Sequence, residues 1–304
     1  MRDQAFRLRE LVETRLPEGA AAAPGPPMVV VAGGKAGVGA TTVAVNLAAV
    51  LADRGERVVL VDAAQQEPNV AHVAGAMAAI ERSVADVLSG ACSAADALAP
   101  GPCGCLLLAH RRTNVNIDFS RHAQQRLLGE LQSLGKTASV LVVDAGRGLT
   151  PWTRRFWLRS RLVILVTTTE DLALIDAYAL VKRGAADGIK TPIRVLANQC
   201  GSDASADDAY GRLSAACQRF LSRPVASLPA LPRWAADDLS GLRGHPRVWE
   251  APNSAFGHGM LWLGRAVNDV IELANSVSCA TACGTRHRFN LAQNTARGLN
   301  EVIR

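Results

Sequence analysis

The chain has 304 residues, of which 49% are hydrophobic, and a formal net charge of +6. This length and apolar content favour one large domain with a buried core, and no apolar run approaches the roughly 18 residues that a membrane-spanning helix needs. The sequence has no signal-peptide core and no regular cysteine framework, so it predicts a cytoplasmic protein with reduced thiols, whose modest positive charge is compatible with an anionic partner.

Residues 1–16 are predicted to form a short amphipathic helix that Asp3 is placed to cap. Its apolar residues recur at helical spacing, at Leu8, Leu11, Val12 and Leu16. Residues 17–27 end in Pro-Gly-Pro-Pro, a run that stops a helix and indicates a flexible linker. A helix separated from the core in this way is either a frayed terminus or a docking peptide that orders on a partner.

The main domain is predicted to span residues 28–276, because short apolar runs alternate there with helical patterns. The expected strands are residues 28–32, 58–61, 140–143, 162–166 and 193–197, and helical stretches include 42–51 and 172–182. The strands are β-branched and apolar on both faces, as in a covered parallel sheet. This alternation predicts a doubly wound α/β fold with a mainly parallel sheet that binds its ligand at the carboxyl ends of the strands.

The strongest motif follows the first expected strand and opens a helix. Residues 33–42 read Gly-Gly-Lys-Ala-Gly-Val-Gly-Ala-Thr-Thr, which has the spacing of a phosphate loop except that alanine stands where lysine is usual. Glycines let backbone N–H groups converge on phosphate oxygens, and the helix N-terminus adds a favourable dipole. The residues predicted to bind the nucleotide are Gly34, Lys35, Gly37, Val38, Gly39, Ala40, Thr41 and Thr42, with the Thr41 hydroxyl also a ligand of Mg²⁺.

This loop resembles the deviant phosphate loop, K-G-G-x-G-K-T, of the MinD/ParA family of ATPases. Lys35 looks like the signature lysine, which in that family reaches the phosphates of the partner subunit across a nucleotide-sandwich dimer. The resemblance therefore implies ATP or ADP as ligand, and a homodimer formed through Lys35. Ala36 replaces a glycine of the family motif, and Ala40 replaces the lysine that acts within the subunit.

Later segments extend the resemblance over roughly residues 28 to 275. Asp62 and Asp144 end two strands and match the family's catalytic and Mg²⁺-site aspartates, whereas Ala64 stands where a second aspartate normally helps to activate water. Asn198 matches an asparagine that the family uses against adenine. A loop beginning at Pro232 and Arg233 resembles the segment that completes the base pocket.

Two motifs point to the flagellar FlhG/FleN branch of the family. Residues 176–182 read Asp-Ala-Tyr-Ala-Leu-Val-Lys, similar to a helix that recurs in this branch. The N-terminal motif D-Q-A-x-x-L-R is matched at each fixed position, by Asp3, Gln4, Ala5, Leu8 and Arg9. In that branch the peptide binds an FlhF-type GTPase and stimulates GTP hydrolysis, a task for which the Gln4 amide is suited because it can both accept from and donate to an attacking water.

Two basic segments have competing interpretations. Aromatic and arginine residues alternate over 152–161, which is typical of an interface or of a helix packed on its neighbour with solvated arginines; we do not expect nucleic acid as a partner. In the tail, residues 277–304, a thin apolar stripe is formed by Phe289, Ala292, Ala296, Leu299 and Ile303. The tail is either a helix on an anionic membrane surface or a disordered segment, since Gly298 interrupts the stripe.

The sequence thus predicts a nucleotide-responsive regulator of flagellar placement or number whose own ATP hydrolysis is impaired by Ala40 and Ala64. Two alternatives stay open at this stage. One is an active ATPase cycling between membrane and cytosol. The other is a localisation factor for another surface machine such as a pilus.

Overall fold

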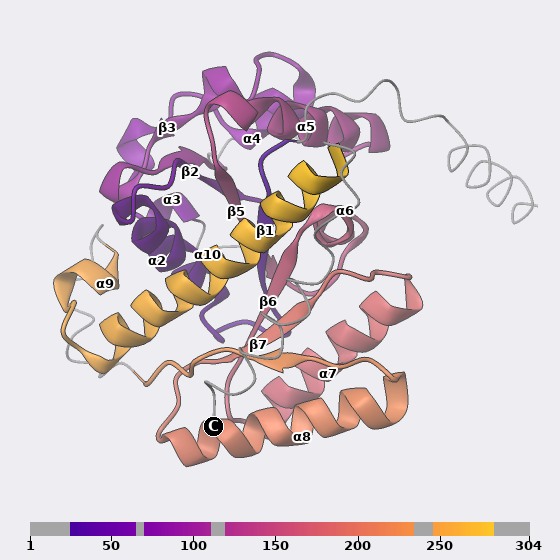
Figure 1. The fold of residues 1–304 in the computed structure, drawn as a ribbon. Helices are drawn as coiled ribbons and strands as arrows, with labels where there is room; N and C mark the ends of the chain where they lie inside the picture. The colour runs from indigo at the N-terminus through magenta and orange to yellow at the C-terminus, as the bar shows by residue number, and fades with distance from the viewer. Residues whose placement is uncertain (1–24, 65–69, 111–118, 234–245, 283–304) are drawn as a thin grey trace, which may run out of the picture.

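The structure is a computed structural model that describes residues 25–64, 70–110, 119–233 and 246–282. Within these residues, eight strands form one sheet in the order β3-β4-β2-β5-β1-β6-β7-β8 (Figure 1). Neighbouring strands are parallel except for β3 and β4, which are antiparallel. The predicted doubly wound, mainly parallel fold is confirmed.

The five strands expected from the sequence are all present. The strands are β1 (Met28–Gly33), β2 (Val58–Asp62), β3 (Ala99–Pro100), β4 (Leu106–Leu108), β5 (Val140–Arg147), β6 (Leu162–Thr167), β7 (Ile193–Ala197) and β8 (Ala226–Ser227). The central strand β1 is buried along its whole length, as expected for a parallel strand covered on both faces. The three strands that the sequence analysis missed, β3, β4 and β8, are short and lie toward the sheet edges.

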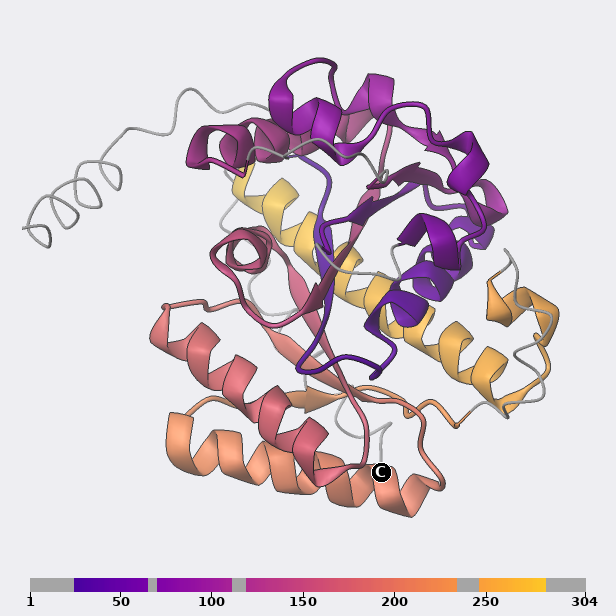
Figure 2. The same cartoon turned by 180° about the vertical axis from the view of Figure 1, so that it is seen from behind.

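Helices cover both faces of the sheet, and alternate residues of β1 point to different layers. Val29 and Val31 face α2 (Ala40–Asp53), α3 (Val70–Val73), α9 (Arg247–Glu250) and α10 (Ala255–Ala282). Val30 and Ala32 face α4 (Val84–Ser89), α5 (Arg121–Ser133), α6 (Pro151–Arg159), α7 (Asp171–Ala186) and α8 (Asp203–Leu221). In Figure 1, α10 runs diagonally across the sheet beside α2, and Figure 2 shows the same layers from behind.

Helix α10 packs on α2 and ends at Ala282, six residues after the predicted end of the main domain. Its buried residues, Phe256, Met260, Leu263, Val267 and Ile271, recur at helical spacing and form part of the core that contains α2. Gly264 lies so close to Val50 of α2 that an added Cβ would be 2.5 Å from the Val50 Cγ1 atom. The boundary that we expected at residue 276 falls inside this helix. No helix of the described ranges is long and apolar enough to cross a membrane.

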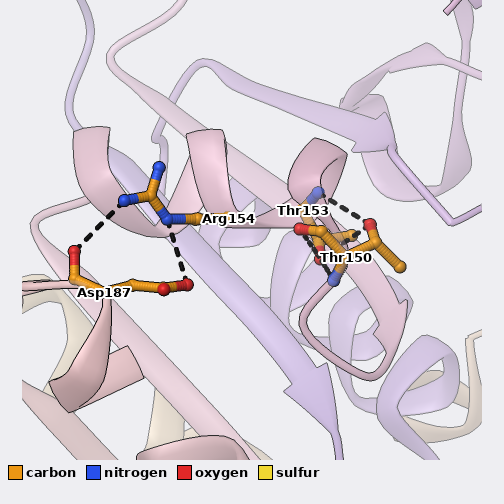
Figure 3. A network of polar contacts seen from close by, with 4 residues as sticks. All are labelled: Thr150, Thr153, Arg154 and Asp187. Carbon is orange, nitrogen blue, oxygen red and sulfur yellow. Dashed lines mark hydrogen bonds and ion pairs between the residues drawn. The ribbon is translucent and has the colours of Figure 1, made fainter. Parts of the chain in front are cut away.

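The aromatic and arginine segment at 152–161 forms α6 and packs on the core. Trp152, Phe156 and Trp157 are buried. The Phe156 and Trp152 rings pack edge to face, with their centroids 4.8 Å apart. Arg154 reaches Asp187 after α7 with an Nε–Oδ2 distance of 3.0 Å, and a capping box of Thr150 and Thr153 fixes the start of the helix (Figure 3). These contacts support the interpretation as a packed helix.

Candidate nucleotide-binding site

The phosphate loop connects the end of β1 to the start of α2, as the sequence predicts. Gly37 and Gly39 have φ angles of 83° and 89°, in the left-handed region that glycine adopts without strain. Gly39 is the N-cap residue of α2 and begins it without a side-chain cap, which leaves the first N–H groups of this helix available to an anion. The loop borders a cleft of about 620 Å³.

The side chains of Asn198 and Gln199 hold the loop from the end of β7. The buried Asn198 Nδ2 donates to the Val38 carbonyl oxygen over 2.7 Å, and Gln199 Nε2 donates to the Gly37 carbonyl oxygen over 2.7 Å. A Cβ at Gly39 would lie 2.4 Å from Asn198 Nδ2, so glycine is required for this approach. Asn198 also lines the cleft, with its Oδ1 left as a hydrogen-bond acceptor. The sequence predicted a role for Asn198 at the base and did not anticipate this support of the loop.

Lys35 forms an ion pair within its own chain. Its Nζ lies 2.9 Å from Oε2 of Glu170, the residue before α7, and both side chains are partly exposed. The interaction with Lys35 lowers the pKa of Glu170. The neighbouring Gly34 lies against α7, where an added Cβ would be 2.7 Å from the Asp176 carbonyl carbon. The first part of the loop is therefore packed against the start of α7.

Asp62 and Asp144 are brought together at the carboxyl ends of β2 and β5. The two residues are register partners and both are fully buried. Asp62 accepts from the backbone N–H groups of Ala64 and Val70, at 3.2 Å each, but burial and the nearby Asp144 raise its pKa to about 8. Burial also raises the pKa of Asp144. Hydrogen bonds from the Thr41 hydroxyl and the Gly146 N–H lower this pKa and so offset part of the rise.

The geometry around Asp144 fits a metal ion that accompanies a nucleotide. Asp144 Oδ1 accepts from the Gly146 N–H over 3.0 Å, whereas the buried Oδ2 has no hydrogen-bond partner within the described part of the chain. Two paired carboxyl groups and the nearby Thr41 hydroxyl are the oxygen ligands that Mg²⁺ prefers, together with phosphate oxygens. The described ranges contain no cluster of three His, Cys, Asp or Glu side chains that could hold a metal ion.

The two alanines that replace charged residues of the family motifs, Ala40 and Ala64, both line the cleft. Ala40 is the first residue of α2 and Ala64 follows β2, and they are 8% and 5% exposed. Neither side chain can donate a hydrogen bond or carry charge. The adjacent Ala63 carbonyl accepts from Trp152 Nε1 of α6 over 2.9 Å, which connects the segment after β2 to the helix that follows β5.

Several lining residues were not anticipated from sequence. Val73, Arg147, Arg247 and Phe256 join the cleft together with the expected Pro232 and Arg233. Arg147 was identifiable in principle, because it follows the aspartate at the end of β5. Arg247 and Phe256 carry no local motif and reach the cleft only because α9 and α10 pack beside α2. The N-terminal motif residues Asp3, Gln4, Ala5, Leu8 and Arg9, and the tail stripe, lie outside the described residues.

Comparisons with known proteins agree with this geometry. Residues 29–246 match the CobQ/CobB/MinD/ParA nucleotide binding domain. The chain is 34% identical over 206 residues to the antiactivator FleN of Pseudomonas aeruginosa, covering 67% of this chain and 73% of FleN. It is 26% identical over 278 residues to the flagellum site-determining protein YlxH of Helicobacter pylori, covering 86% and 88% of the two chains.

Among solved structures, the fold is similar to that of MinD from Pyrococcus horikoshii complexed with Mg-ADP. The TM-score is 0.62 at 22% identity, over 80% of this chain and 96% of that one. At this identity the likeness concerns the fold.

Proposed function

Since the chain belongs to the MinD/ParA family of nucleotide-binding domains, we propose that it is a nucleotide-responsive regulator of flagellar placement or number. The observation that carries the proposal is the glycine-rich loop open to a cleft at the strand ends, with Asp62 and Asp144 paired beneath it. The flagellar assignment is supported by the similarity to FleN and YlxH and by the N-terminal motif.

The proposed ligand is ATP or ADP with Mg²⁺. Mg²⁺ would screen phosphate charge when bound, and Thr41, Asp62 and Asp144 are the residues suited to hold it. The loop N–H groups would bind phosphate oxygens. Asn198 Oδ1 would accept from the exocyclic amine of adenine, since its Nδ2 is already used by Val38. A titration of the full chain with ADP and with a non-hydrolysable ATP analogue, with and without Mg²⁺, tests this assignment; absence of binding would reject it.

We further propose that the protein hydrolyses ATP very slowly. The family lysine that neutralises phosphate charge is Ala40, and the second switch aspartate is Ala64. Both positions border the cleft as buried methyl groups, and no charge or hydrogen bond from them can stabilise a transferring phosphoryl group. The chain would then act as a binding switch.

The proposed output is an FlhF-type GTPase bound through residues 1–16. The peptide alone should accelerate GTP hydrolysis by such a GTPase from the same organism. Gln4→Ala is expected to lose stimulation and keep much of the binding, because the apolar anchor at Leu8 and Leu11 remains. Leu8→Asp should lose both, since it introduces a charge into the docking face. Arg9→Ala should weaken binding in a salt-dependent way.

The matched control for these variants is Arg7→Ala, which lies at a position that the motif leaves free. GTP turnover and a pull-down with the full chain are the two measurements. If the full chain captures no GTPase and the peptide does not stimulate one, the flagellar assignment fails and only the nucleotide-binding fold is left.

We also propose a homodimer in which Lys35 contacts the nucleotide of the partner subunit. Two exposed apolar side chains follow Glu170 on α7, Leu172 at 68% and Ile175 at 60% exposure. A second copy would cover these two side chains. In the structure Lys35 forms an ion pair with Glu170. Dimer formation would therefore require Lys35 to leave Glu170 and bind a phosphate of the partner's nucleotide.

A further inference from the structure

The cleft has an excess of positive charge that the phosphate loop does not account for. Within the described residues, four cationic side chains line it, from Lys35, Arg147, Arg233 and Arg247, and no carboxylate does. The electrostatic field of these four cations attracts a polyanion and raises its local concentration. The lysine usually supplied by the loop is absent at Ala40, and the question is which of these cations compensates for it.

Three of the four interact electrostatically with a glutamate, and one of these, Lys35, forms an ion pair. Lys35 is paired with Glu170 at 2.9 Å, and Arg233 also acts electrostatically on Glu170. Arg247 is attracted by Glu250 of the same short helix. Arg147 has no ion pair with any described residue and its side chain is exposed. Its charge is therefore available to a ligand without breaking an ion pair, unlike that of Lys35.

The backbone fixes Arg147 at the phosphate end of the cleft. Between Val31 and Gly33 the pairing of β1 with β5 shifts, so that Val31 is opposite Asp144 but Gly33 is opposite Arg147. This bulge adds one residue to β5, and bulges re-aim the side chains beside them. The Gly148 N–H then donates to the Gly33 carbonyl oxygen over 3.0 Å, which ties the segment to the start of the phosphate loop.

Arg147 is thus three residues beyond the buried Asp144 and next to Gly146, which donates to that aspartate. The family resemblance assigns Asn198 and the loop at Pro232 and Arg233 to the base, whereas Arg147 adjoins the aspartate and the start of the phosphate loop. We propose that Arg147 binds the terminal phosphate of the nucleotide and supplies the positive charge that Ala40 lacks. A guanidinium can contact two phosphate oxygens at once, and its charge persists at any physiological pH. The consequence is a site that favours the triphosphate over the diphosphate.

This inference rests on the proposed nucleotide site, and binding rather than turnover tests it. The full chain with Mg²⁺ is titrated with ATPγS and ADP by calorimetry. Arg147→Ala should weaken ATPγS binding on the order of ten- to a hundredfold and change ADP binding less than about threefold. Arg147→Lys should recover part of the loss, and adding Ala40→Lys to Arg147→Ala should recover more.

Arg233→Ala is the matched control, because it removes an arginine from the same cleft at a position that the family resemblance assigns to the base, and it should weaken both nucleotides alike. Equal thermal unfolding of all variants excludes misfolding. If Arg147→Ala leaves the ratio of ATPγS to ADP affinity unchanged while the unsubstituted chain binds both, this inference alone is overturned. If the unsubstituted chain binds neither nucleotide, the proposed site and this inference fall together.

Discussion

Lys35, which lines the cleft, and Glu170 of the same chain form an ion pair, with Nζ and Oε2 2.9 Å apart. Both groups are partly exposed, and exposed ion pairs of this kind are weak and screened by salt. The pair can therefore hold Lys35 in the single subunit and still give way to a phosphate of a partner-bound nucleotide. This relation makes Glu170 a competitor for the proposed dimer contact.

Glu170→Gln should increase the dimer fraction measured by sedimentation velocity with Mg²⁺ and an ATP analogue, because Lys35 is released. Lys35→Ala should reduce the dimer fraction, and Glu170→Gln should have no further effect in that background. Asp171→Asn is the control, since it removes the adjacent carboxylate, which pairs with Arg212 at 2.7 Å instead. An unchanged dimer fraction in Glu170→Gln would argue against the competition.

Restoring both missing groups should restore catalysis. The double variant Ala40→Lys, Ala64→Asp should raise phosphate release at least on the order of a hundredfold, because each group stabilises charge or orients water in the transition state. Each single variant should gain less. Ala36→Gly is the control, as it restores a family residue that is exposed and carries no functional group. Turnover in the unsubstituted chain equal to that of active MinD-type enzymes would contradict the proposal.

Asn198→Ala should loosen the phosphate loop. It removes a buried 2.7 Å hydrogen bond to Val38, so the free energy of unfolding should fall by about 1–3 kcal/mol in urea denaturation, and adenine-nucleotide affinity should fall with it. Gln199→Ala removes the equivalent bond to Gly37 at an exposed position and should have a smaller effect on stability. Equal effects of the two variants would count against a special role for the buried bond.

The nucleotide-free protein should lose stability as the pH rises. The pKa of Asp62 is raised to about 8 by burial and by Asp144, well above its value of about 4 in an unfolded chain. The native state therefore binds more protons between these values, and the free energy of unfolding falls as pH increases through 8, by up to a few kcal/mol. Asp62→Asn should flatten this dependence, measured by urea denaturation from pH 5.5 to 8.5.

The exposed Asp207→Asn on α8 serves as the control for that series and should leave the slope unchanged. Because Mg²⁺ with a nucleotide would favour the ionised form of the two carboxyl groups, its addition should also reduce the slope in the unsubstituted chain and not in Asp62→Asn. A flat profile for the unsubstituted, nucleotide-free protein would refute the raised pKa.

A membrane role for the tail can be tested with a truncation placed by the structure. Because α10 continues to Ala282, the chain should be ended there rather than at residue 276. If the tail forms a surface helix, anionic liposomes should sediment the full chain and not the truncated one, with less binding at high salt since four arginines and one glutamate occur after residue 276. Equal sedimentation of both chains would leave the tail without a membrane role.

The sequence by itself determined the layers of the fold and the chemistry of the loop. Strands β1, β2, β5, β6 and β7 were predictable because a parallel strand buried on both faces must be apolar throughout, and residues 33–42 were recognisable because a phosphate loop constrains consecutive residues. In contrast, β3, β4 and β8 have three residues or fewer, too few to show a period, and their partners in the sheet define them.

Only the tertiary structure decided which distant groups meet at the loop. Asn198 contacts Val38 across 160 residues of sequence, Glu170 forms an ion pair with Lys35 of the same chain, and Arg147, at the end of the bulged segment of β5, lines the cleft. Local sequence specifies backbone preference over a few residues, whereas these contacts depend on the sheet order that sets strand ends side by side. Strand order comes from the packing of both helical layers at once, and no single segment encodes it.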